Sequence, residues 1–208
     1  MPIKAILYDM DGVLIDARDW HYEALNDALG LFGYTISRES HLTTFDGLPT
    51  RKKLEILTHA QGLPEGLHEF LNSLKQSFTM RRVHLCCRPT YIHQRALSAF
   101  HQAGYKQAVC SNSVRGSVTS MMELSGLDTY LDTIVSNEDV ANAKPHPEMY
   151  QKAMEVLGVH PHESLILEDN EHGIQAAIAS GGHLLKIGSP NDVSYGNIKQ
   201  RIAEIDQS

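Results

Sequence analysis

The chain has 208 residues, of which 42% are hydrophobic and 21% are charged, and its net charge is −7 at pH 7. This composition fits a folded globular protein, and the acidic balance argues against the broad basic face that nucleic-acid binding requires. Three cysteines give no disulfide framework, no stretch approaches membrane-spanning length, and Met1-Pro2-Ile3-Lys4 leads straight into an apolar run. We therefore expect a cytoplasmic protein whose partners include neither nucleic acid nor membrane.

The first predicted element is a short apolar strand that ends in two carboxylates. Residues 3–8 lead into Asp9-Met10-Asp11-Gly12. Side chains two residues apart in an extended strand lie on one side, which would place Asp9 and Asp11 together. Gly12 indicates a turn there. Two carboxylates held this close need a cation between them or a shared proton.

Residues 17–87 are predicted to form consecutive helices with no strand among them. Apolar residues recur at three- and four-residue steps from Trp20 to Phe32, and Gly33 stops the pattern. After a loop over 43–49, helices are predicted over about 50–61 and from Pro64 to about Phe78. Such a bundle can bury a small core of its own. We expect an inserted helical domain.

From Pro89 onward, predicted strands and helices alternate. Helices are expected over about 91–102, 115–125, 148–157, 174–180 and 198–205, and strands over 106–110, 133–135, 165–167 and 183–187. Alternation implies parallel strands joined by right-handed crossovers. The predicted fold class is α/β, with a Rossmann-like parallel sheet core formed by residues 1–16 and 88–208 and split by the helical insertion.

Four of the predicted strands end in polar residues. These ends supply Asp9 and Asp11, Ser111-Asn112-Ser113, the segment 136–139 followed by Lys144, and Glu168-Asp169-Asn170. Because the strands run parallel, their carboxyl ends converge on one edge of the sheet, where ligands bind. Each piece alone has an ordinary explanation as a turn, a helix cap or a solvated lysine. The combination is far more specific.

These motifs resemble those of the haloacid dehalogenase (HAD) superfamily of phosphotransferases. The matching pieces, in the family's order, are Asp9-Met10-Asp11-Gly12-Val13, Ser111-Asn112, Lys144-Pro145 and Glu168-Asp169-Asn170. The helical insertion is similar to the cap of the subfamily that includes β-phosphoglucomutase and many small-molecule phosphatases. The resemblance implies a catalytic core of residues 1–16 and 88–208 with a cap of residues 17–87.

The resemblance implies catalytic roles for three residues. Asp9 would be the nucleophile that forms an aspartyl-phosphate. Asp11 would protonate the leaving oxygen and later deprotonate the attacking water. Lys144 would supply fixed positive charge to the aspartate and to the transferring phosphoryl group.

The resemblance also implies a cation site and a phosphate site. Mg²⁺ would be held by the Asp9 carboxylate, the Asp11 carbonyl and Asp169, with Glu168 as a ligand or an outer partner. Ser111 and Asn112 are expected at the start of a helix, where backbone N–H groups bind a phosphate oxygen together with Lys144.

Two cap residues are candidates for substrate binding. His21 follows Asp9 by twelve residues, as a cap-hinge histidine does in β-phosphoglucomutase-like proteins; a packing role is the alternative. Arg51 resembles the cap arginine that holds a distal phosphate in mutases, although its spacing from Gly47 is one residue longer, and a solvated helix face is the alternative. Lys75 lies where related caps offer a substrate-facing lysine, but an ordinary structural role is favoured there.

The resulting hypothesis is a Mg²⁺-dependent phosphatase for a small phosphorylated metabolite, such as a sugar phosphate, acting as a monomer or weak homodimer. Asp11 favours phosphate-ester chemistry, because carbon–halogen cleavage in this family does not need a proton donor at that position. The main alternative is a β-phosphoglucomutase-like mutase, which shares the first half-reaction. The other alternative is a non-catalytic protein that binds a phosphorylated ligand or a partner.

Overall fold

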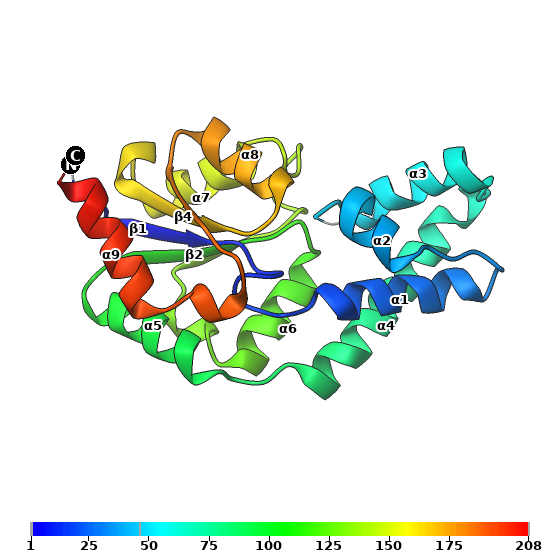
Figure 1. The fold of residues 1–208 in the computed structure, drawn as a ribbon, viewed down its shortest axis with the longest axis horizontal. Coiled ribbons are helices and arrows are strands. Elements are labelled where there is room, and N and C mark those ends of the chain that lie inside the picture. Colours follow the sequence, from blue (N-terminus) through cyan, green and yellow to red (C-terminus); the bar gives the residue numbers. More distant parts are fainter. Residues whose placement is uncertain (1, 46, 208) are drawn as a thin grey trace. The chain divides into compact units, whose positions relative to one another are not determined.

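The computed structural model describes residues 2–45 and 47–207 (Figure 1). Met1 and Ser208 of the predicted core and Asp46 of the predicted loop are outside the described residues. The chain divides into two compact units, Met1–Asp16 with Arg88–Ser208 and Ala17–Cys87. Among the helices described, none combines the length and the apolar character that a membrane crossing requires.

The larger unit is built on a five-stranded parallel sheet, with strands in the order β3-β2-β1-β4-β5. The strands are β1 (Ala5–Tyr8), β2 (Lys106–Cys110), β3 (Thr133–Val135), β4 (Ser164–Glu168) and β5 (His183–Lys186). The register pairs Tyr8 of the central strand with Val109 on one side and Leu167 on the other. The predicted α/β class with a parallel, Rossmann-like sheet is confirmed.

Helices cover both faces of this sheet. They are α5 (Tyr91–Gln102), α6 (Arg115–Ser125), α7 (Glu148–Leu157), α8 (Glu171–Ser180) and α9 (Tyr195–Asp206), with short 3₁₀-helices at Asp128–Tyr130, Pro161–Glu163 and Pro190–Asp192. Figure 1 shows α7 and α8 on one face and α5 and α6 on the other. Buried residues of α7 and α8 join Leu7 and Ile166 in one apolar cluster. Every residue of β1 and β4 is buried, which explains why these two strands are mostly apolar instead of alternating between apolar and polar residues.

The start of α8 lies three residues before the position predicted from apolar periodicity. The Asn170 side chain accepts a hydrogen bond from the Gly173 N–H at 3.0 Å, which caps the helix. The polar first turn of α8 therefore belongs to the helix although it carries no periodic apolar residue.

Every regular element that the structure describes in the smaller unit is a helix or a helical turn. Its elements are α1 (Arg18–Gly30), α2 (Arg38–Ser40), a π-helical turn (His41–Phe45), α3 (Thr50–Gln61), a 3₁₀-helix (Glu65–Leu67) and α4 (His68–Cys86). The predicted loop over 43–49 was wrong for residues 43–45, which belong to the π-helical turn. Ser37 caps α2 through a hydrogen bond from the Ser40 N–H, and the buried side chains of His41 and Phe45 hold the turn that follows.

The buried face of α4 differs from the predicted apolar stripe. Its buried residues follow one another at four-residue steps: Leu71, Lys75, Thr79 and Val83. Phe70, which belonged to the predicted stripe, is 55% exposed. Two of the four buried positions hold polar residues, which a search for apolar periodicity does not detect.

We expect Thr79→Val to raise the free energy of unfolding by about 1 kcal/mol. The Thr79 hydroxyl is fully buried, and it has no hydrogen-bond partner within the described part of the chain. An unsatisfied buried hydroxyl costs roughly 1–3 kcal/mol, and valine keeps the branched shape without the polar atom. Urea unfolding measures the change. Thr58→Val is the matched control and should destabilise, because the Thr58 hydroxyl contacts the Leu63 carbonyl oxygen at 2.8 Å. A loss of stability in Thr79→Val would contradict the prediction.

Candidate active site

The carboxyl ends of three neighbouring strands bring most of the predicted site residues together. Asp9 follows β1, Ser111 follows β2, and Glu168 ends β4. Because β1 lies between β2 and β4, Asp9 occupies the middle of the group. The Asp9 N–H donates to the Leu167 carbonyl at 3.0 Å, so the ladder of the sheet fixes the Asp9 backbone. Asp9 is only 5% exposed.

Lys144 connects all three of these strand ends. Its Nζ donates to Asp9 Oδ1 at 2.6 Å, to Glu168 Oε1 at 2.6 Å and to the Cys110 carbonyl at 2.9 Å. All three ammonium protons therefore have acceptors, and the side chain is almost fully buried. The ring of Tyr150 also lies beneath the cation, with its centroid 4.7 Å from Nζ. Lys144 is held in one position by this set of contacts.

Glu168 is fully buried and accepts hydrogen bonds on both oxygens. Oε1 accepts from Lys144 and from the Tyr150 hydroxyl in a short hydrogen bond, and Oε2 accepts from the Asp169 N–H at 3.2 Å. The carboxylate also lies against Gly173, where a Cβ atom would come within 2.1 Å of its atoms. Only glycine at position 173 leaves room for this carboxylate.

Three carboxylates form a group suited to a hard divalent cation. Oxygen atoms of Asp9, Glu168 and Asp169 all lie within 4.8 Å of one another. Oxygen ligands at such separations are those that Mg²⁺ prefers, and repulsion among the carboxylates favours a cation among them. The donor set therefore fits the ion implied by the sequence motifs.

Asp11 lies beside the loop that follows β2. Gly12 has a φ of +90°, which a residue with a side chain rarely adopts, and the chain turns there as predicted. The Ser113 hydroxyl donates to Asp11 Oδ2 at 3.2 Å. The Asp11 carboxylate is half-buried, so it can exchange protons with a bound group or with water.

The expectation that Ser111 and Asn112 start a helix was wrong. The helix α6 begins at Arg115, and the Ser113 N–H instead donates to Ser111 Oγ at 3.1 Å, which keeps the segment in a turn. The Asn112 side chain hydrogen-bonds the backbone of Lys144. Its amide NH₂ donates to the Lys144 carbonyl at 3.2 Å, and its Oδ1 accepts from the Lys144 N–H at 3.0 Å. Asn112 thus fixes the Lys144 backbone.

The charges in this group follow from burial and proximity. Burial, followed by repulsion from the Glu168 carboxylate, raises the pKa of Asp9 well above its usual range, and a cation bound beside it would oppose both effects. Burial alone lowers the pKa of Lys144, but the Asp9 and Glu168 carboxylates outweigh burial and hold it above its ordinary value. Burial raises the pKa of the Cys110 thiol to about 12, so this cysteine is not a thiolate.

The candidate cap residues lie in the smaller unit. His21 is in the first turn of α1, and the buried Lys75 of α4 has its Nζ 3.1 Å from His21 Nδ1. Arg51 is exposed in the first turn of α3. The structure thus brings His21 and Lys75 together on neighbouring helices of this unit.

Two residues that contact the group were not identified from the sequence as parts of a site. Tyr150 lies on the buried face of α7, six residues after Lys144, and no role was assigned to it from the sequence. A buried tyrosine hydroxyl needs a partner, and this requirement is the signal that could have identified it. Ser113 belonged to the polar run after β2, but no role followed from its sequence.

Tyr150→Phe is expected to weaken the site without removing any charge from it. The substitution takes one donor from the buried Glu168 carboxylate, which should destabilise the fold by roughly 1–3 kcal/mol. Burial and the nearby Glu168 charge raise the pKa of Tyr150, so its hydroxyl keeps its proton and the loss should be the same from pH 6 to pH 9. Thermal unfolding at these two pH values measures it. Tyr91→Phe, at a 78% exposed position, is the control.

Comparisons with known proteins were made for the sequence and for the fold. Residues 6–187 match the family model described as haloacid dehalogenase-like hydrolase. A pyrophosphatase PpaX from Oceanobacillus iheyensis is 30% identical over 177 residues, covering 84% of this chain and 78% of the relative. A phosphorylated carbohydrates phosphatase from Thermotoga maritima is 26% identical over 179 residues, covering 86% of this chain and 82% of the relative.

Solved structures share the fold at lower identity. A β-phosphoglucomutase from Clostridium difficile superposes with a TM-score of 0.86 at 19% identity, covering 99% of this chain and 100% of that one. CbbY from Rhodobacter sphaeroides, in complex with phosphate, gives 0.79 at 22% identity, covering 88% and 84%. At these identities the likeness establishes the fold alone.

Proposed function

The chain belongs to the haloacid dehalogenase-like hydrolase family, and we propose that it is a Mg²⁺-dependent phosphatase of a small phosphorylated metabolite. The family and the phosphatases among its relatives support an enzyme that hydrolyses phosphoric monoesters. The observation that carries the proposal is the contact of Lys144 with Asp9 inside a group of three carboxylates. A buried cation, a carboxylate nucleophile and a divalent cation site together match phosphoryl transfer.

In the proposed reaction Asp9 attacks phosphorus as the bond to the ester oxygen breaks, which gives an aspartyl-phosphate on Asp9. Asp11 donates a proton to the leaving oxygen, so the product leaves as a neutral alcohol. Asp11 then accepts a proton from water, and the water attacks phosphorus to release inorganic phosphate and regenerate Asp9. The hydrogen bond from Ser113 keeps the Asp11 carboxylate in place between the two steps.

Within the cation site we assign Asp9 and Asp169 as carboxylate ligands, with the Asp11 carbonyl, and Glu168 as an outer partner. Glu168 Oε1 already accepts two hydrogen bonds and Oε2 accepts one, which leaves one lone pair of the four. When bound, Mg²⁺ would neutralise charge on the phosphoryl oxygens.

We assign Lys144, Ser111 and Asn112 to the phosphate side of the site. Lys144 supplies the positive charge, and the two hydrogen bonds between the Asn112 side chain and the Lys144 backbone keep that charge beside Asp9. Because α6 begins only at Arg115, the donors proposed for phosphate oxygens belong to the 111–114 turn rather than to a helix. The Ser111 and Ser113 N–H groups are not among them, because they already donate to the Val135 carbonyl and to Ser111 Oγ.

Substrate choice is assigned to the unit of residues 17–87, acting as a cap. His21 and Lys75, in contact with each other, and Arg51 are the residues proposed to bind the part of the substrate beyond its phosphate. The names of the relatives suggest two classes to test, a phosphorylated carbohydrate and inorganic pyrophosphate. We propose that the enzyme works as a monomer or weak homodimer.

A phosphatase assay tests the proposed function. Phosphate release from an aryl phosphate should require Mg²⁺ and stop when a chelator removes it. A panel of phosphorylated metabolites, with pyrophosphate included, should then give one class with a kcat/KM at least tenfold above the aryl phosphate. Absence of Mg²⁺-dependent phosphate release from every substrate would reject the proposal and leave the ligand-binding alternative.

The mutase alternative rests on His21, whose Nδ1 lies 3.1 Å from Lys75 Nζ, and on Arg51, all in a unit proposed to bind substrate. A hexose 1-phosphate supplied with a bisphosphate primer separates the two activities. If isomerised sugar phosphate accumulates faster than inorganic phosphate, the enzyme is a mutase. The phosphatase proposal requires that inorganic phosphate accumulates faster than isomerised sugar phosphate.

A further inference from the structure

Lys144 lies in the middle of a surface loop, although its own side chain is buried. Residues 141–147 lead into α7, which begins at Glu148. The exposed residues of this loop are Ala141, Asn142, Pro145 and His146. Exposed loops open more easily than the strands and helices beside them, because few buried contacts hold them. The position of the Lys144 ammonium therefore depends on the contacts that fix this loop.

The carboxylate of Glu148 joins the beginning of the loop to its end. Its Oε1 accepts a hydrogen bond from the Ala141 N–H at 2.7 Å. Its Oε2 accepts from the Asn142 N–H and from the Asn142 side-chain amide, both at 2.9 Å. Two consecutive backbone N–H groups are thus bonded to one planar carboxylate. This arrangement closes a loop that has Lys144 near its middle.

These hydrogen bonds also keep Glu148 ionised. The bond from the Ala141 N–H, followed by the bond from the Asn142 side chain, lowers the pKa of Glu148 below its ordinary value. Hydrogen bonds to an ionised acceptor are stronger than those between neutral groups. Glu148 therefore holds the loop as a carboxylate at neutral pH.

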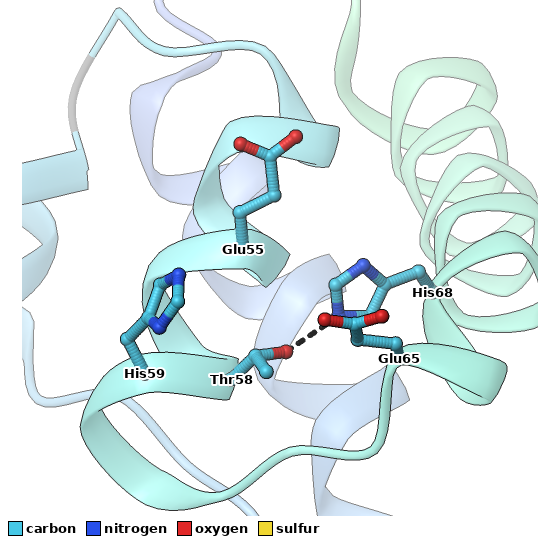
Figure 2. A pocket seen from close by; sticks show the side chains of 5 residues that line it. All are labelled: Glu55, Thr58, His59, Glu65 and His68. Atoms are coloured by element: carbon cyan, nitrogen blue, oxygen red, sulfur yellow. Dashed lines mark hydrogen bonds between the residues drawn. The ribbon is translucent and has the colours of Figure 1, made fainter.

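Glu55, in the smaller unit, shows how the contacts of an ordinary surface carboxylate differ from these. It accepts a hydrogen bond from the Lys52 ammonium at 2.8 Å, and both side chains are more than half exposed. Such a pair joins two flexible side chains and contributes little to stability. Glu55 also borders a pocket of about 400 Å³ that no step of the proposed reaction uses (Figure 2). The residues that line this pocket are Glu55, Thr58, His59, Glu65 and His68. Glu148, in contrast, binds the main chain close to a residue assigned to catalysis.

Glu148 and Asn112 hold Lys144 through different elements. The Asn112 side chain, in the turn after β2, bonds both the N–H and the carbonyl of Lys144. Glu148 bonds the backbone two and three residues before Lys144. It also begins the helix on which the Tyr150 ring lies 4.7 Å from the Lys144 ammonium. The loop, the turn after β2 and α7 are thereby tied to one another around Lys144.

We propose that Glu148 is a positioning residue of the enzyme, which fixes the loop that places the Lys144 ammonium beside Asp9. The proposal rests on the proposed function, since it gives Glu148 a part in phosphoryl transfer. A fixed charge stabilises a transition state only while it stays in its place, and a displacement of about 1 Å can lower a rate by roughly 100-fold. Loss of Glu148 should therefore lower the rate although every reacting group is still present.

Amide hydrogen exchange tests the positioning without any need for activity. The Lys144 amide, which donates to Asn112 Oδ1, should exchange at least roughly 10-fold faster in Glu148→Ala than in the wild type. Glu148→Gln keeps one acceptor oxygen and should give a rate between the two. Glu155→Ala on α7 and Glu55→Ala on α3 remove exposed carboxylates and should leave the rate unchanged. An unchanged exchange rate of the Lys144 amide in Glu148→Ala would overturn the proposal.

Aryl-phosphate kinetics at saturating Mg²⁺ measure the consequence for the reaction. In Glu148→Ala, kcat and kcat/KM should both fall by roughly 10- to 100-fold. In Glu155→Ala, on the same helix, both should stay within about twofold of the wild type. The thermal midpoint of Glu148→Ala should stay within about 4 °C of the wild type, and a larger fall would show a structural role instead and overturn the proposal. An active wild type with unchanged kcat in Glu148→Ala would overturn this proposal alone. A wild type that hydrolyses no phosphate ester would reject the proposed function, and this proposal with it.

Discussion

Asp9→Asn is expected to lower kcat for aryl-phosphate hydrolysis by at least roughly 10⁴-fold, because removal of a covalent nucleophile costs an enzyme most of its rate. Asparagine has the same shape as aspartate, but its amide cannot form the aspartyl-phosphate. Steady-state phosphate release with saturating Mg²⁺ measures the loss. A residual rate within 100-fold of the wild type would show that another residue is the nucleophile.

The fold of Asp9→Asn should survive. The substitution removes one of three crowded carboxylates, while Lys144 keeps its hydrogen bonds to Glu168 and to the Cys110 carbonyl. We expect the thermal midpoint without Mg²⁺ to be equal to or above that of the wild type, because burial and Glu168 already disfavour the ionised form of Asp9. The stabilisation by added Mg²⁺ should shrink, since one ligand has lost its charge. A large drop in the midpoint would mean that the activity loss reports unfolding.

Lys144→Met is expected to have the second largest effect, acting on both stability and activity. Lys144 is 3% exposed, and its ammonium contacts two buried carboxylates at 2.6 Å. Its removal leaves both carboxylates without their cation, and breaking a buried ion pair in this way costs roughly 3–5 kcal/mol. Methionine fills the volume, so the loss reports charge rather than a cavity. Urea unfolding without Mg²⁺ measures the cost.

The comparison with an exposed lysine isolates the role of burial. Lys106→Met, also in the larger unit, removes an ion pair with Asp132 whose lysine is 54% exposed. Such a pair contributes about 1 kcal/mol or less. Mg²⁺ should restore part of the stability lost in Lys144→Met, because a bound divalent cation can neutralise the same carboxylates. It should restore none of the stability lost in Lys106→Met. Activity should not return in Lys144→Met even at saturating Mg²⁺. Similar costs in the two variants would contradict the assigned role of Lys144.

The fold could be predicted from the sequence because its signals are local. Each strand of the larger unit is a short apolar run next to a helix, and parallel pairing then follows from the alternation. The parallel pairing also predicted that Asp9, Lys144 and Glu168 lie at one edge of the sheet. In the structure Lys144 contacts both Asp9 and Glu168 there.

What could not be predicted depends on contacts that the sequence does not display. Lys75 and Thr79 occupy buried positions of α4 through tertiary packing, although their polarity suggests a solvent-facing side. Asn112 was expected at a helix start, but its side chain bonds the Lys144 backbone 32 residues away in the chain. Tyr150 contacts Glu168 through a hydroxyl that apolar periodicity ignores. In each case a long-range partner, not local sequence, decides the role.

The position of β1 in the sheet has a consequence for the order in which the protein is made. This strand is synthesised before the other four strands of the sheet, yet it is central, and its partners are β2 and β4. The strand β4 begins at Ser164, 156 residues after Tyr8, which corresponds to about 8 to 30 s of synthesis at roughly 5–20 residues per second. The helices of residues 17–87 can complete their own core in that interval. The residue proposed as nucleophile is therefore synthesised before the other residues of the site but reaches its final surroundings only after β4 is made, and the apolar β1 depends on protection from aggregation until then.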